Sequence, residues 1–153
     1  MKPISREALR QYYTDTLYKP AVLLTIERSH ERFYGRPRLM KDFIPSCQFH
    51  DTITEFKGES KVAGYAVGTA SVHIANWILR DSTQAKGVVR HEIAHLVQRY
   101  MYGDSCRPHG KEFIQALKIV SPNNWRKDRH WHDSPEVAEV RKECEHTNKI
   151  HLT

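Results

Sequence analysis

The sequence contains only three cysteines, Cys47, Cys106 and Cys144, and no two of them form a CxxC pair. Disulfide frameworks and zinc ribbons use closely paired cysteines, so we expect neither, and a reducing cytoplasm is the default compartment. The longest apolar stretch, AVLLTI at 21–26, includes a threonine. A membrane-spanning helix needs about 20 apolar residues, so we expect no membrane segment.

Three further features are absent. The first fifteen residues, MKPISREALRQYYTD, lack the continuous apolar segment of a signal peptide. No glycine- or serine-rich linker divides the chain, and the absence of GxGxxG and GxxxxGK excludes the usual phosphate-binding loops. The chain has 153 residues, 39% of them hydrophobic and 27% charged. This composition predicts one domain over residues 1–153, and we expect a monomer.

Capping residues and apolar spacing predict helices at both ends of the chain. Ser5 is expected to cap a helix that runs to about Tyr18. Pro20 is expected to open a second helix that ends near Gly35. A long helix is expected from Ser82 to about Tyr102, a shorter one over 110–120, and a last one after Ser134, with 123–133 irregular. The expected buried residues of the second and last helices are Val22, Leu23, Ile26, Phe33, Val137, Val140 and Cys144.

The segments 47–56 and 61–79 are rich in β-branched and aromatic residues and are punctuated by glycines. They predict two to four short strands in a small antiparallel sheet. Together with the flanking helices, this predicts an α+β fold.

Residues 88–98, VVRHEIAHLVQ, carry the chemistry that stands out. On a helix each residue advances about 100°, so His91, Glu92 and His95 share one side. Apolar residues occupy the opposite side. Imidazoles four apart can reach one metal ion, and a catalytic zinc takes three protein ligands. The pattern predicts one Zn²⁺ per chain held by His91 and His95, with Glu92 as the base that takes a proton from the attacking water.

The spacing of residues along the sequence does not identify the third zinc ligand uniquely. An extended HExxHxxGxxH pattern is excluded, because Gln98 and Met101 occupy its glycine and histidine positions. Seven residues after the helix can span about 23 Å, which is enough to bring His109 back to the site. The best candidate is therefore His109, and the alternatives are Glu112, Cys106 and His73.

Positive charge is concentrated in two places. The net charge is +6, and residues 28–41 alone hold five Lys/Arg against one Glu, or +4. Near the C-terminus, WRKDRHWH at 125–132 interleaves tryptophans with cations that could contact a nucleic acid. Packing of both tryptophans against the domain is the alternative. The candidate DNA-binding residues are Arg28, Arg32, Arg36, Arg38, Lys41, Trp125, Arg126, Lys127, Arg129 and Trp131.

Three linked motifs, KVAGYAVGTASVHIANWIL, VVRHEIAHLVQ and PHGKEF, resemble the SprT-like zinc metalloprotease domain, whose relatives include the Spartan DNA–protein crosslink proteases. The resemblance covers roughly residues 5–120. The motif positions are Gly64, Ile74, Asn76, His91, Glu92, His95, His109, Gly110 and Phe113.

The resemblance implies a minimal zincin-like fold, with zinc held by His91, His95 and His109 and Glu92 as the catalytic base. It also implies cleavage of DNA-bound or DNA-crosslinked proteins, with DNA binding coupled to activity. The expected location is the cytoplasm, in association with the nucleoid if DNA binding holds. The paired cysteines of the zinc ribbon found in many relatives are missing, so residues 121–153 are expected to be an extension without a ribbon.

Two other functions stay open. One is a DNA-binding or regulatory module in which zinc is purely structural, and the presence of Glu92 argues against it. The other is a peptidase with a regulatory substrate and no dependence on DNA, and the basic patch argues against that.

Overall fold

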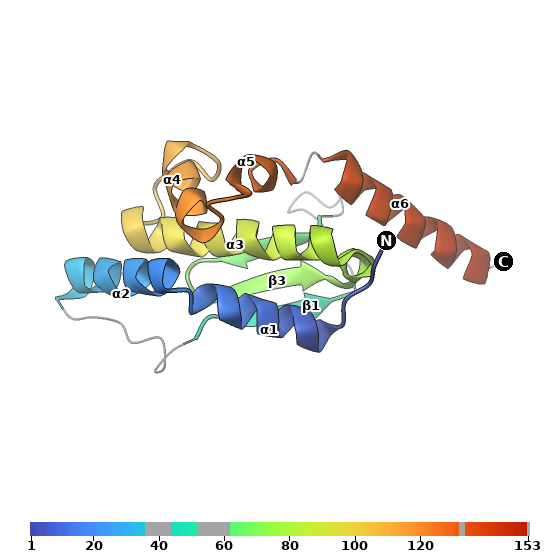
Figure 1. Cartoon of the computed structure of the whole chain (residues 1–153), viewed down its shortest axis with the longest axis horizontal. Helices are drawn as coiled ribbons and strands as arrows, with labels where there is room; N and C mark the ends of the chain where they lie inside the picture. The colour runs from blue at the N-terminus through green and yellow to red at the C-terminus, as the bar shows by residue number, and fades with distance from the viewer. Residues whose placement is uncertain (36–43, 52–61, 132–133, 153) are drawn as a thin grey trace.

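The computed structural model describes residues 1–35, 44–51, 62–131 and 134–152, with the backbone alone for 146–152. These residues form six α-helices, one 3-10 helix and a three-stranded sheet (Figure 1), which confirms the α+β class. None of the described helices has the length and apolar character that crossing a bilayer requires. The helices are α1 Arg6–Leu17, α2 Pro20–Tyr34, η1 Asn76–Arg80, α3 Ser82–Tyr102, α4 Lys111–Val120, α5 Trp125–Asp128 and α6 Pro135–Leu152.

The helix boundaries follow the local capping signals. The Ser5 hydroxyl accepts a hydrogen bond from the backbone N–H of Ala8 at 3.0 Å and starts α1. Helix α2 begins at Pro20 and ends at Gly35, whose φ of 75° is a left-handed conformation that favours glycine. The Ser134 hydroxyl similarly accepts the N–H of Val137 at the start of α6. These predicted boundaries are confirmed.

The sheet consists of β1 Ser46–His50, β2 Gly64–Val67 and β3 Ser71–Ala75, in the order β1-β3-β2. Strands β2 and β3 form an antiparallel hairpin, but β1 pairs with β3 in parallel. The prediction of a wholly antiparallel sheet is therefore wrong. The chain crosses from β1 to the far edge before it turns back, which places β3 in the middle and in the same direction as β1. Part of the expected strand region, 52–56, lies outside the described residues.

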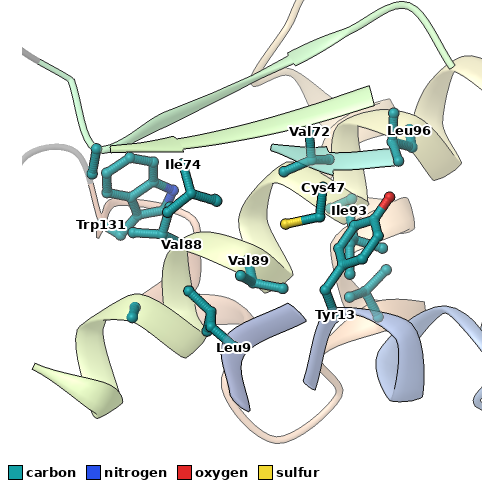
Figure 2. Close-up of a cluster of buried hydrophobic side chains, with 14 of the residues drawn as sticks. Leu9, Tyr13, Cys47, Val72, Ile74, Val88, Val89, Ile93, Leu96 and Trp131 are labelled. Atoms are coloured by element: carbon teal, nitrogen blue, oxygen red, sulfur yellow. The ribbon is translucent and has the colours of Figure 1, made fainter. Parts of the chain in front are cut away.

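Helix α3 lies at the centre of the molecule and packs against α1, α2, the sheet and α4. Its apolar side, including Val89 and Ile93, meets Leu9 and Tyr13 of α1 and the inner face of the sheet (Figure 2). These side chains are almost fully removed from water, and their burial is the main stabilising contribution to such a core.

Three local expectations differ from the structure. Phe33, predicted to face the core, is 54% exposed in the last turn of α2, beyond the part of the helix that packs. Asn76, which lies in the segment 61–79 predicted to form strands, instead begins the 3-10 helix η1. The segment expected to be irregular contains the short helix α5, because its buried Asp128 is bonded to α3.

Candidate metal centre

His91 and His95 project from α3, and the loop between α3 and α4 brings His109 to them. His91 and His95 are buried, at 0% and 7% exposure, whereas His109 is exposed. One nitrogen from each of the three rings lies within 4.8 Å of the others. The structure therefore joins the predicted HExxH pair to the favoured third residue.

The arrangement of the three rings fits a metal ion. Two nitrogens bound to one tetrahedral zinc at about 2.0–2.1 Å lie roughly 3.3 Å apart. The Nε2 atoms of His91 and His109 are 3.2 Å apart. The ring centroids are separated by 5.0, 5.1 and 4.9 Å, and the planes are inclined by 74°, 45° and 64°. These inclinations show that the three rings are not stacked face to face.

The tautomer of His91 follows from its hydrogen bond. Its Nδ1 atom lies 2.6 Å from the backbone carbonyl oxygen of Asp128. A carbonyl can only accept, so Nδ1 carries the proton and donates it. The unprotonated Nε2 is then the nitrogen that faces His109, which is the state a metal ligand needs.

Two aromatic rings pack against the histidines. Phe113 of α4 lies 4.8, 4.4 and 5.1 Å from the ring centroids of His91, His95 and His109. Trp131 meets His91 edge to face at 5.2 Å. Both rings are buried, so they limit the rotamers of the histidines and exclude water from that side.

The loop that carries His109 is tied to α3 by Gln98. The buried Gln98 side chain donates a hydrogen bond from Nε2 to the backbone carbonyl of Arg107, at 3.0 Å. This bond fixes the chain two residues before His109. In the sequence, Gln98 is evident only as the residue that occupies the glycine position of the extended HExxHxxGxxH pattern. Its role in holding the loop was not predicted.

Glu92 lies one residue after His91 on α3 and is 1% exposed. Burial raises the pKa of its carboxyl to about 8, and the positive charge of Arg99 acts in the opposite direction. A divalent cation beside Glu92 would act in the same direction as Arg99, lowering the pKa and favouring the carboxylate.

The three alternative ligands do not join the cluster. The only group of three metal-ligating side chains found among the described residues is His91, His95 and His109. His73 lies on β3, within hydrogen-bond distance of His50 and Ser71. Cys106 and Glu112 flank His109 without belonging to the group.

The candidate DNA-binding residues are spread over two surfaces. Arg28 and Arg32 are exposed on α2, whereas Arg36, Arg38 and Lys41 lie outside the described residues. Near α5, Arg126 and Lys127 are exposed and Arg129 is half-buried. The half-buried Trp125 ring has Lys118 Nζ and the Arg126 guanidinium each 4.8 Å from its centroid.

Trp131 differs from the other candidates. It is 3% exposed and packs against His91. Its ring is therefore not offered to a base in this structure, and for this tryptophan the packing alternative holds.

A mixed α+β domain with three convergent histidines on and beside its central helix defines a candidate metal-binding protein. The model of the SprT-like family matches residues 6–133, which is most of the chain, and the chain belongs to this family. The resemblance predicted from the linked motifs is thereby confirmed. The family points to a zincin-like domain of the metallopeptidase type and to zinc as its metal. Searches of curated proteins and of solved structures gave no significant match.

Proposed function

We propose that the protein is a zinc-dependent endopeptidase in which His91, His95 and His109 hold one zinc ion and Glu92 is the catalytic base. The observation that supports this proposal is the convergence of three imidazole nitrogens. A buried glutamate, Glu92, lies beside them on the helix that bears His91 and His95. Zinc sites that serve only folding use four protein ligands, whereas catalytic sites use three and leave a position open. The three-histidine set supports a peptidase over a module with a structural zinc.

When bound, the zinc ion would polarise the scissile carbonyl and make a water molecule more acidic. Glu92 accepts a proton from that water as its oxygen attacks the carbonyl carbon. The same carboxyl then donates the proton to the nitrogen of the departing segment as the C–N bond breaks. Burial raises the pKa of Glu92, and a bound divalent cation would lower it, so the metal would favour the carboxylate form that accepts the proton.

The experiment that tests the mechanism is Glu92→Gln, which removes the proton acceptor and leaves all three histidines. We expect zinc content and folding like those of the wild type, with hydrolysis of an unfolded protein substrate reduced by roughly 10²-fold or more. Glu7→Gln, at an exposed position on α1, is the matched control and should have full activity. A Glu92→Gln variant as active as the wild type would refute the assigned mechanism.

We further propose that the substrates are proteins bound or crosslinked to DNA. A net charge of +6 and the exposed Arg28 and Arg32 on α2 support attraction to a polyanion. Arg126 and Lys127 provide a second exposed cationic site next to Trp125, whose ring could stack on an unpaired base.

Fluorescence anisotropy with single-stranded and duplex oligonucleotides tests the DNA proposal. Affinity should fall steeply with salt, since each phosphate contact releases counterions. Arg28→Ala/Arg32→Ala should weaken both forms, and Trp125→Ala should weaken single strands more than duplex. Lys2→Ala/Lys142→Ala removes the same charge from other exposed positions and serves as the control.

Cleavage assays decide between the two kinds of peptidase. A DNA-binding protein should be cleaved faster when single-stranded or duplex DNA is present. Zinc-dependent cleavage that DNA does not change, with no binding at low salt, would instead favour the regulatory peptidase.

A further inference from the structure

The Asp128 side chain, at the end of the short helix α5, is 2% exposed and accepts three hydrogen bonds. Arg90 of α3 donates two of them, from Nε to Oδ2 at 2.6 Å and from Nη2 to Oδ1 at 3.0 Å. Ser121 donates the third, from Oγ to Oδ2 at 2.6 Å. A carboxylate held by both arms of a guanidinium and by a hydroxyl has a fixed orientation.

The backbone of the same residue acts on the metal centre. The Asp128 carbonyl accepts the Nδ1 proton of His91 at 2.6 Å, and His91 directly follows Arg90 on α3. Two consecutive residues of α3 therefore hold Asp128 at two points, one through its carboxylate and one through its carbonyl. A shift of the carboxylate would move the carbonyl that defines the His91 tautomer.

The Arg90–Asp128 pair is also bordered by Tyr12 and Gly87. Arg90 also donates from Nη1 to the Tyr12 hydroxyl of α1 at 2.9 Å, which fixes the guanidinium from its other side. A Cβ atom at Gly87 would lie 3.3 Å from Asp128 Oδ1, so a larger residue there would press on the carboxylate.

We propose that Asp128 is a positioning residue for the metal ligand His91. Arg90 and Ser121 hold its carboxylate, so its carbonyl keeps the His91 ring oriented and protonated on Nδ1, with Nε2 available to zinc. This inference rests on the proposed zinc site. Groups that orient metal-bound histidines in this way typically contribute 10–100-fold to metal affinity.

The test is Asp128→Asn, which keeps the size of the side chain and removes its charge. Zinc affinity, measured by competition with a chelator on protein shown to be folded by circular dichroism, should fall by roughly 10–100-fold. In the metal-free protein, ¹H–¹⁵N correlation spectra of the imidazoles should show His91 as the Nδ1–H tautomer in the wild type. The Asp128→Asn variant should gain the Nε2–H form.

A control variant separates positioning from a general loss of stability. Tyr13→Phe removes a buried hydrogen bond to the Pro45 carbonyl, which does not involve the Arg90–Asp128 pair. This variant should be less stable than the wild type, with unchanged zinc affinity and His91 tautomer.

Ser121→Ala is the milder variant if Asp128→Asn does not fold, and a smaller change of both readouts in the same direction is expected. Wild-type zinc affinity and an unchanged His91 tautomer in a folded Asp128→Asn or Ser121→Ala protein would overturn the inference. Because neither readout involves hydrolysis, a protein that binds zinc but cleaves nothing would contradict the proposed function and leave this inference standing.

Discussion

Two groups of histidines in this protein show opposite uses of the same side chain. In the first, the rings of His91, His95 and His109 are steeply inclined to one another, and one nitrogen from each ring lies within 4.8 Å of the others. In the second, His50 and His73 lie side by side on β1 and β3, with planes inclined by 29°. The second group is a cluster within the sheet, with no third ligand among the described residues.

The difference lies in where the nitrogen lone pairs go. In the sheet, His73 Nδ1 is 2.7 Å from His50 Nε2, and His73 Nε2 is 2.8 Å from the Ser71 hydroxyl. Tyr65 stacks on the His73 ring at 4.4 Å with an angle of 6°. Both nitrogens of His73 are thus engaged by protein groups. At the metal centre, the Asp128 carbonyl accepts the Nδ1 proton of His91, and the Nε2 atom of His91 lies 3.2 Å from that of His109. One nitrogen from each of three rings converges there, and this convergence, not the number of histidines, distinguishes the metal centre.

The strongest test of this comparison is to remove each pair. His91→Ala/His95→Ala should reduce the bound zinc from about one per chain to nearly none, because two of three ligands are lost. His50→Ala/His73→Ala should retain about one zinc per chain, although it will be less stable. Metal analysis after dialysis measures both. Full zinc content in the first variant, or its loss in a folded second variant, would break the distinction.

The next test concerns the third ligand. His109→Ala should weaken zinc binding by more than the roughly 10–100-fold typical of an outer partner, because it removes a direct ligand. Glu112→Gln and Cys106→Ser alter the alternative ligands in the same loop region and should bind zinc nearly as tightly as the wild type. If Glu112→Gln has the larger effect, the ligand set must be revised.

The features that the sequence predicted well are those encoded within one element. The caps Ser5 and Ser134 determine helix starts through bonds to residues three positions away, and HExxH presents its side chains through helical spacing alone. His109 was reachable only as the best of four candidates, because its place depends on how the loop after α3 folds back.

Features that depend on distant residues were missed. The parallel pairing of β1 with β3 requires knowledge of strand order, which alternating apolar patterns do not carry. Asp128 acts on His91 through a backbone carbonyl, so no residue type or spacing could indicate it. The sequence alone left Trp131 open between base stacking and packing against the domain, because cations flank it, and only the fold shows that it turns inward against His91.

The smallest expected effect concerns acid stability and probes the sheet cluster. Burial lowers the pKa of His73, and the positive charge that His50 can carry lowers it further. As pH falls below about 6.5, the unfolded chain binds a proton at His73 before the folded chain does, so folding stability decreases. The loss ends once pH has passed below the folded-state pKa.

His73→Gln removes this titration and keeps a polar side chain between His50 and Ser71. Between pH 7 and pH 5 its free energy of unfolding should therefore fall less steeply than that of the wild type. One proton accounts for at most about 1.4 kcal/mol per pH unit. Urea unfolding of metal-free protein across this range measures the difference, and the zinc-site histidines, present in both proteins, cancel in the comparison. Equal slopes would mean that His73 titrates alike in the folded and unfolded chains, and that its paired nitrogens do not resist protonation as the geometry requires.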